Sequence, residues 1–269
     1  MDKYRNYSFK KLLDDLINFS EIKFILMEKM LIENGNLLLE NIFIITIGIY
    51  AYIKGIKCLA MNNNVAAGNV LLRSIFEGLI NIKYITQDES QLRAVSFELN
   101  DFKKQKKFVQ DIIENYDNLK SFVEKTELSD ISSCKIKLEE IDDRRKEYLD
   151  IYEKNFAIKI EDNDQIQWEE KIWKKAPSVG LFSEYKSIYP YLCSFAHLDA
   201  TGLKTFFQLG DKTYDINIEK GKDDVESLLG ITCAFYLKTL NEVLKKFNLF
   251  TEEEFKPFEK TFKVLNSNS

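Results

Sequence analysis

Histidine, proline and glycine are all scarce in this sequence. Its 269 residues include 1 histidine, 3 prolines and 10 glycines. Proline and glycine most often end helices and form the tight turns between strands, so their scarcity favours long helices over many short strands. A lone histidine without a CxxC pair also argues against a zinc site, because such sites combine several histidine and cysteine ligands.

The sequence contains cysteines, but their spacing does not indicate a disulfide framework. The sequence has 4 cysteines, at positions 58, 134, 193 and 233, and none lies in a CxxC pair. No secretory signal is visible at the N-terminus. We therefore expect reduced thiols and a cytoplasmic location, because disulfide frameworks form in oxidising compartments.

Several catalytic signatures are missing. The sequence contains no glycine-rich phosphate loop, no GxSxG elbow and no cysteine beside its histidine. It also has no Glu-x-x-His pair of the kind that builds di-metal sites in helical bundles. These absences argue against nucleotide hydrolysis by a phosphate loop and against acyl transfer, and we expect neither a metal nor a cofactor.

Positive charge is in slight deficit, and one long run has no charge. A net charge of -5 and a pI near 5.3 argue against a general nucleic-acid binder but leave a local basic patch open.

The run from Asn41 to Ile53 is uncharged and is bracketed by Glu40 and Lys54. Because a membrane-spanning helix needs about 20 apolar residues, we expect a buried helix of a soluble bundle and no stable membrane insertion.

The apolar residues that are present recur at helical spacing and predict an all-α, multi-helix bundle. We expect helices at about 7–32, 37–60, 65–85, 91–125, 132–156 and 168–176 (ended by Pro177), from 182 onward, and at 223–247. A capping box, "TEEE", starts a peripheral C-terminal helix at about 251–265. A small β-hairpin near 205–218 surrounds Gly210-Asp211. We find no domain boundary and expect residues 1–269 to form a single helical domain.

The helices at 37–60 and 65–85 form the expected centre of the bundle, as an antiparallel pair. Small residues allow two helix backbones to approach closely. They are Ala51 and Gly55 in the first helix and Ala67, Ser74 and Gly78 in the second. We expect these residues to line the contact between the two helices.

A narrow polar ridge crosses the apolar helix at 65–85. Asn69, Arg73, Glu77 and Asn81 follow one another at intervals of four residues, with apolar residues on both sides. A ridge this narrow indicates the edge of a groove or the inside of a bundle rather than open surface. It is either an ion pair that fixes helix register or a site where Arg73 holds an anion.

His197 is the residue best suited to move a proton near neutral pH. It lies in a segment that also contains Tyr191 and Ser194. Asp199 would orient the imidazole only if the helix ends there, because residues two apart on a helix do not face each other. The alternative is a hydrogen-bonded structural histidine.

Two of these motifs together resemble an uncharacterised all-helical bacterial family, domain of unknown function 5677. The motifs are "LLRSIFEGLINIKYI" (71–85) and "YPYLCSFAHLD" (189–199), and the resemblance covers roughly 37–202. Its members share an LLRxxxE helix, a tryptophan segment and a YxxxSxxxH helix. The residues that correspond here are Arg73 with Glu77, Trp168 or Trp173, and Tyr189 or Tyr191 with Ser194 and His197. The resemblance implies a fold and a residue cluster but no reaction.

A looser resemblance connects the chain with helical RNases of the HEPN type, which use arginine and histidine within one short motif. Here Arg73 and His197 lie on different helices. By that analogy we expect a metal-independent RNase, or another phosphate-handling effector of a toxin or antiviral system, acting on RNA or a nucleotide. Arg73 would bind the anion, His197 would be the acid and base, and Glu77 would assist. The expected substrate-binding residues are Asn69, Asn81, Arg93, Tyr191 and Ser194.

The alternative function is non-catalytic. In that case the chain is a dimeric helical interaction module, and Arg73, Glu77 and His197 form a structural polar cluster. A homo-oligomer is expected under both interpretations.

Overall fold

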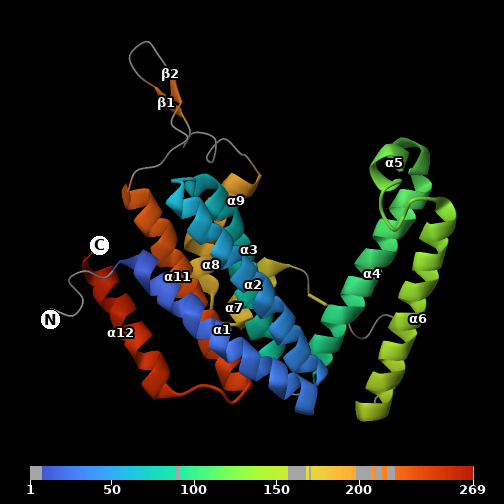
Figure 1. The fold of residues 1–269 in the computed structure, drawn as a ribbon, viewed down its shortest axis with the longest axis horizontal. Coiled ribbons are helices and arrows are strands. Elements are labelled where there is room, and N and C mark those ends of the chain that lie inside the picture. The colour runs from blue at the N-terminus through green and yellow to red at the C-terminus, as the bar shows by residue number, and fades with distance from the viewer. Residues whose placement is uncertain are drawn as a thin grey trace. The chain divides into compact units, whose positions relative to one another are not determined.

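The structure, a computed structural model, describes residues 8–88, 91–156, 168–169, 171–197, 207–209, 214–216 and 222–268. It is an all-α bundle to which one short hairpin is added (Figure 1). The helices are α1 (Phe9–Asn34), α2 (Leu37–Met61), α3 (Val65–Thr86), α4 (Leu92–Glu114), α5 (Tyr116–Val123), α6 (Ile131–Phe156), α7 (Ile172–Ser178), α8 (Phe182–Ser187), α9 (Tyr189–Ala196), α11 (Lys222–Lys246) and α12 (Glu252–Asn268). The strands are β1 (Phe207–Leu209) and β2 (Tyr214–Ile216), which pair antiparallel within the region where a hairpin is expected. The expected Gly210-Asp211 turn lies outside the described residues.

The contacts divide the chain into two compact units, where the sequence analysis expects one domain. Unit 1 contains residues 1–89 and 171–269, and unit 2 contains residues 90–170. No proline or glycine lies between Gly78 and Pro177. The sequence therefore lacks the proline- and glycine-rich composition that often marks a linker.

Two asparagine-containing turns organise the first three helices of unit 1. Asn36 caps α2 by accepting a hydrogen bond from the Leu39 N–H at 3.0 Å, and Asn64 caps α3 by accepting one from the Ala67 N–H at 3.2 Å. Between α2 and α3, Asn63 adopts a left-handed conformation (φ 54°), which asparagine tolerates better than most residues. The short turns make successive helices antiparallel.

Small residues lie at the contact between α2 and α3, as expected for Gly55 and Gly78. A Cβ at Gly55 would lie 2.9 Å from Leu71 Cδ1, and one at Gly78 would lie 2.9 Å from Ile49 Cδ1. Ala51 is different, because it is exposed instead of facing α3. Only part of the expected small-residue face is therefore used inside the bundle.

Helix α11 completes the core of unit 1, and α12 covers its edge. Figure 1 shows α11 beside α3 and α1, and α12 along α1. Phe235 of α11 stacks on Phe76 of α3 with ring centroids 4.9 Å apart. In α12, Phe255 is 2% exposed and contacts Phe19 of α1, so this C-terminal helix contributes to the core as well as covering it.

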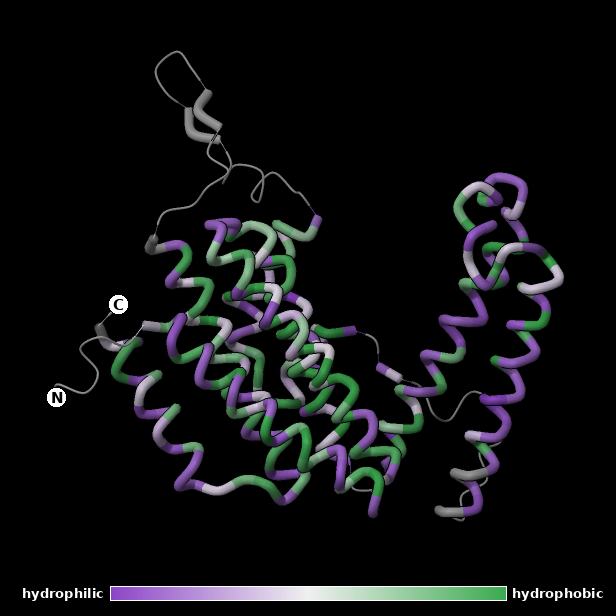
Figure 2. Tube along the Cα trace, in the orientation of Figure 1, coloured by the Kyte–Doolittle hydropathy of each residue, from purple (hydrophilic) through white to green (hydrophobic). Residues whose placement is uncertain are grey.

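Helix α2 is less buried than its apolar composition predicts. Only 28% of its most apolar 18-residue window is buried, against 56% for α3. Figure 2 shows hydrophobic residues along α2, and several of them, Ile44 and Ile47 included, are exposed. Among the described residues, α2 and α3 are long and apolar enough to cross a membrane by length and composition. The expectation of a buried helix is wrong for one face of α2, because α1, α3 and α11 cover only part of its surface.

Unit 2 is built from α4, α5 and α6. Its own apolar core contains Phe102, Val109 and Ile112 of α4, Val123 of α5, and Cys134 and Ile141 of α6. The helix expected over 91–125 is interrupted at Asn115, whose side-chain Nδ2 donates to the Asp111 carbonyl at 2.9 Å. This local bond ends α4 in a way that hydrophobic spacing does not reveal.

Two prolines mark the short helices α7 and α9. Pro177 lies inside α7 instead of ending it, one residue before the last residue of the helix. Pro190 lies in the first turn of α9, where its missing N–H has no partner to lose. Pro190 therefore opens α9 and separates it from α8.

Candidate functional site

The structure brings Arg73, Glu77 and His197 together. Arg73 Nε donates to Glu77 Oε1 at 2.9 Å, as their spacing on α3 predicts. Arg73 Nη1 lies 3.1 Å from His197 Nε2 at the end of α9. The Arg73 and Glu77 side chains are 23% and 31% exposed, so the cluster lies at the surface of unit 1, partly shielded from water.

Tyr189 is the fourth member of this cluster. Its hydroxyl donates to Glu77 Oε1 at 2.7 Å, and its ring lies 5.6 Å from the Arg73 guanidinium carbon. The ring is held between Tyr185, stacked at 5.1 Å, and Phe76 at 5.9 Å. Tyr189 therefore fixes both Arg73 and Glu77, whereas Tyr191 is 46% exposed and hydrogen-bonds to Asn69.

The charges in the cluster stabilise one another. Burial lowers the pKa of Arg73, but the neighbouring Tyr189 and Glu77 more than offset that effect and raise the pKa above its ordinary value. Burial, and then the hydrogen bond to Glu77, raise the pKa of Tyr189 well above its ordinary value. At neutral pH the arginine is therefore a cation and the tyrosine a neutral hydrogen-bond donor.

His197 caps the C-terminus of α9 and is exposed. A guanidinium has only N–H donors, so His197 Nε2 is the acceptor in its contact with Arg73. The imidazole in this arrangement carries its proton on Nδ1 and holds its Nε2 lone pair toward Arg73. Asp199, considered as an orienting carboxylate, lies outside the described residues.

Of the expected residues Asn69, on α3, and Tyr191 and Ser194, on α9, only Tyr191 is exposed. Asn69 is 3% exposed, and its side chain hydrogen-bonds to Tyr191. Burial and the charge of Asp224 raise the pKa of Tyr191, and the bond to Asn69 opposes them. Ser194 is 2% exposed and donates to the Tyr191 carbonyl at 2.7 Å, so its hydroxyl is engaged inside α9.

Asn81 lies at the other end of the ridge and has a different neighbour. Lys175 of α7 is 1% exposed, and its Nζ donates to Asn81 Oδ1 at 2.6 Å. The same ammonium lies 5.9 Å from the Tyr84 ring centroid. Asn81 thus anchors a buried lysine.

Arg93, the remaining expected residue, belongs to unit 2, where its carbonyl accepts from Ser96 Oγ at 2.9 Å.

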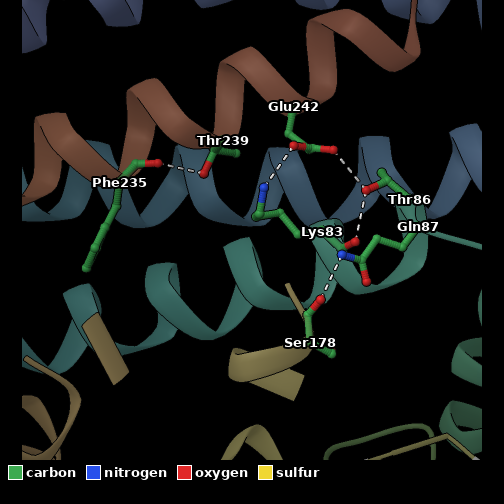
Figure 3. Close-up of polar contacts among 7 residues, drawn as sticks. All are labelled: Lys83, Thr86, Gln87, Ser178, Phe235, Thr239 and Glu242. Atoms are coloured by element: carbon green, nitrogen blue, oxygen red, sulfur yellow. Dashed lines mark hydrogen bonds and ion pairs between the residues drawn. The ribbon is translucent and has the colours of Figure 1, made fainter. Parts of the chain in front are cut away.

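A second polar cluster occupies the C-terminal end of α3 (Figure 3). Lys83 Nζ and Thr86 Oγ1 both donate to the Glu242 carboxylate of α11 at 3.1 Å, and Gln87 Nε2 donates to the Ser178 carbonyl at 2.9 Å. Lys83, Glu242 and Gly180 line a pocket of about 210 Å³. Each polar group named here already has a partner, which indicates a structural role.

Within the described part of the chain, no group of three or more His, Cys, Asp or Glu residues could hold a metal ion.

The spacing of Arg73 and Glu77 on one helix predicts their contact, but the sequence gives little indication of where Tyr189 and Lys175 lie. Tyr189 enters only as an alternative to Tyr191, and its position relative to Glu77 depends on how α9 crosses α3. Lys175 carries no signal beyond its place in a short helix before Pro177.

Comparisons with known proteins give one match. No curated protein matches the chain, and no solved structure does. The model of the Family of unknown function (DUF5677) matches residues 42–214, which include most of α2, all of α3 and α9, and therefore the whole Arg73 cluster. Because this match covers well over half of the chain, the protein belongs to the Family of unknown function (DUF5677).

Proposed function

We propose that the cluster of Arg73, Glu77, Tyr189 and His197 is a phosphate-handling site that cleaves RNA without a metal ion. The observation that carries the proposal is the 3.1 Å contact between Arg73 Nη1 and His197 Nε2. It pairs a permanent cation with a nitrogen that can accept a proton, at a partly exposed position. Anion binding and proton transfer are the two functions that such a cleavage requires.

Arg73 would bind the phosphate, and its neighbours would position it. Glu77 holds Nε, and the Tyr189 ring lies against the guanidinium, so Nη1 remains directed to the edge where His197 lies. An arriving phosphate would take the place of the imidazole as acceptor for Arg73. That exchange frees the His197 Nε2 lone pair close to the bound anion.

The chemical step would follow from this exchange. His197 Nε2 takes the proton of a ribose 2′-hydroxyl, and the 2′-oxygen forms a bond to the adjacent phosphorus. The bond from phosphorus to the 5′-oxygen breaks, and that oxygen takes a proton from water; the hydroxide left behind takes the proton from His197 and restores the neutral imidazole. The products are a 2′,3′-cyclic phosphate and a 5′-hydroxyl end. Arg73 stabilises the negative charge on the phosphoryl oxygens.

Asn69 and Tyr191 would extend the site along the substrate. Asn69 lies one turn of α3 before Arg73 and hydrogen-bonds to Tyr191 of α9, which is 46% exposed. An exposed aromatic ring can stack on a base, and such stacking contributes about 1–3 kcal/mol per base. By analogy with HEPN-type RNases, an enzyme of this kind would be a cytoplasmic effector of a toxin or antiviral system.

One observation favours the second candidate, a structural cluster in an interaction module. Glu77 Oε1 accepts from both Arg73 and Tyr189, so the carboxylate compensates the arginine charge and ties α3 to α9. A closed network of this kind needs no ligand. It predicts that losing Arg73 or Tyr189 lowers stability and affects no reaction.

Replacing His197 by glutamine separates the two candidates. A glutamine side-chain oxygen can still accept from Arg73, but the amide cannot take a proton at neutral pH. Wild type, Arg73→Ala, His197→Gln and His197→Ala would be purified and incubated with labelled single-stranded RNA, duplex RNA and tRNA. Cleavage, 2′,3′-cyclic phosphate ends and melting temperature would be measured, together with host toxicity on expression.

Catalysis predicts that His197→Gln keeps the wild-type melting temperature and loses cleavage by at least about 100-fold. Lys83→Met is the matched control, because it removes a cation from the same helix, away from the cluster. It should retain cleavage. Intact RNA with the wild-type protein, or cleavage that His197→Gln leaves unchanged, would contradict the proposed reaction.

A further inference from the structure

We propose that the exposed face of α2 is a self-association surface, through which two copies of this chain pair antiparallel about a two-fold axis near Ile47. The pairing is independent of the proposed RNA cleavage. It rests on which residues of α2 are exposed, on their spacing, and on the charges at the two ends of the exposed stripe.

The exposed stripe has the spacing of a helix–helix seam. Its members lie alternately four and three residues apart and are all exposed: Glu40, Ile44, Ile47, Ala51, Lys54 and Cys58. This alternation is the spacing of the contact positions in a coiled coil. A helix that only covered the bundle would carry polar residues on such a stripe. Here the middle of the stripe is apolar.

The opposite face of α2 already fixes the helix in unit 1. Ile42, Ile53 and Ile56 are 0% exposed, and Ile49 is 2% exposed. The stripe is therefore not needed to hold α2 in place. Its apolar residues remain in contact with water in the single chain, which is unfavourable unless another surface covers them.

Charge selects an antiparallel pairing. Glu40 lies seven residues before Ile47, and Lys54 lies seven residues after it. In an antiparallel pair centred on Ile47, Glu40 of each copy comes opposite Lys54 of the other. A parallel pair would place glutamate against glutamate and lysine against lysine. Only the antiparallel arrangement gives two ion pairs, and two-fold symmetry forms both at once.

Side-chain size agrees with the same register. Ile44 and Ala51 lie on either side of Ile47, so a large residue of one copy meets a small residue of the other. Gly48 is next to the axis, and apart from its own turn of α2 no described atom lies within 4 Å of a Cβ placed on it. A glycine with open space in front of it lets a second helix approach closely.

The neighbouring helix supplies additional apolar area. The stripe on α2 is about 27 Å long and about 10 Å wide, an area of roughly 270 Å², which is less than the area of about 800 Å² that a stable dimer interface buries on each copy. On α1, Ile22, Ile25 and Leu26 are 63%, 68% and 40% exposed. They flank Phe24, which contacts both Phe43 and Tyr50 of α2, so they lie level with the middle of the stripe.

A lipid bilayer is the competing partner for an apolar helix face. Glu40 and Lys54 delimit a charge-free segment about 20 Å long at 1.5 Å per residue. That is shorter than the bilayer hydrocarbon core of about 30 Å. The opposite charges at matched distances from Ile47 also favour a second copy, because a bilayer gives no advantage to one charge of each sign.

Charge reversal tests both the partner and the register. Self-association of the full chain would be measured by analytical ultracentrifugation from about 1 to 100 μM, for wild type, Glu40→Lys, Lys54→Glu and the double variant. Each single reversal places like charges opposite each other twice and should weaken the dimer by about tenfold. The double variant restores two ion pairs and should return the affinity to near the wild-type value. Melting temperatures of the dilute variants serve to check folding.

A matched pair of apolar substitutions tests the stripe itself. Ile44→Glu places a charge on the stripe, and Phe182→Glu places one on α8, which packs on α7 and α9, at a residue that is 50% exposed. The first should abolish the dimer, and the second should leave it intact. Mixing wild type with vesicles of phosphatidylcholine and phosphatidylglycerol provides the lipid arm.

The outcomes either support or overturn the pairing. A concentration-dependent dimer that Ile44→Glu abolishes, and that the double reversal restores after each single reversal weakens it, supports the proposal. A wild-type chain that stays monomeric up to 100 μM overturns it, whether or not the chain sediments with vesicles. A dimer that both single reversals leave unchanged overturns the antiparallel register.

Discussion

At the scale of single residues, Tyr50 of α2 connects this helix to α1. Its hydroxyl donates to the carboxylate of Glu21, and its ring packs edge-on against Phe24 at 5.1 Å. Burial, and then the hydrogen bond to Glu21, raise the pKa of Tyr50 from 10.0 to about 12. The folded chain therefore keeps this proton at pH values where the unfolded chain has lost it.

This pKa shift gives stability a defined pH dependence. Because the folded-state pKa is above the unfolded-state value, the contribution of Tyr50 is fully present below pH 10 and is lost as pH rises through about 12. Urea unfolding between pH 9 and 12 should show a smaller loss of stability for Tyr50→Phe than for wild type. Tyr52→Phe, at an exposed tyrosine of the same helix, should behave as wild type. Equal pH dependence for wild type and Tyr50→Phe would contradict the assignment.

The sequence predicts some contacts of the candidate site and not others. Arg73 and Glu77 are four apart on one helix, so helical geometry alone brings them together. His197 lies 124 residues from Arg73, and their contact depends on how α9 crosses α3. Asn81 shares the ridge, yet a buried lysine binds it. Spacing within a helix is thus readable from the sequence, whereas contacts between distant helices are not.

At the scale of helices, two glycines in the first half of unit 1 have opposite surroundings. A Cβ at Gly68 would lie 2.5 Å from Leu228 Cδ2 of α11, whereas a Cβ at Gly48 would meet no described atom within 4 Å apart from its own turn of α2. Both are inside helices, where glycine is about 1 kcal/mol less favourable than alanine. The same substitution should therefore have opposite effects at the two positions.

The Gly48→Ala variant should be more stable than wild type by about 0.5–1 kcal/mol. The Gly68→Ala variant should be less stable, by about 1–3 kcal/mol, because Leu228 is 2% exposed and has little room to move. Urea unfolding at micromolar concentration or below would measure both, so that association does not contribute. Similar changes in both variants would contradict the packing described for Gly68.

Helix boundaries were well predicted where a cap defines them. Asn36 and Asn64 set the starts of α2 and α3, and both starts agree with the sequence analysis. The break at Asn115 and the inclusion of Pro177 in α7 were missed, because side-chain bonding and tertiary packing decide them. The exposure of Ala51 was also missed, since an apolar run does not indicate which of its faces the bundle covers.

At the scale of the whole molecule, the all-α class follows from the scarcity of glycine and proline, but the division into units does not. Unit 2 has its own core, in which Ile112 is 4% exposed, and Ile75 is 0% exposed in the core of unit 1. No proline or glycine lies between Gly78 and Pro177 to mark residues 90–170 as a separate unit. Only the contacts between helices reveal it.

Two core substitutions should show that the units unfold separately. Isoleucine-to-alanine changes in a core cost about 2–5 kcal/mol. Ile112→Ala should speed hydrogen exchange in α4, α5 and α6 and leave α1, α3 and α11 protected, and Ile75→Ala should do the reverse. Mass spectrometry of exchanged peptides would measure both. Equal acceleration throughout the chain in either variant would show that the two units unfold together.

The position of unit 2 between α3 and α7 has a consequence during synthesis. Helices α2 and α3 emerge from the ribosome before α11, whose first residue is Lys222. At roughly 5–20 residues per second, they wait on the order of ten seconds for the helix that covers them. During that interval the most apolar part of the chain is exposed on a nascent polypeptide, while residues 90–170 can already fold. A ribosome-associated chaperone that covers α2 and α3 should therefore increase the yield of folded protein most during the interval before α11 is synthesised.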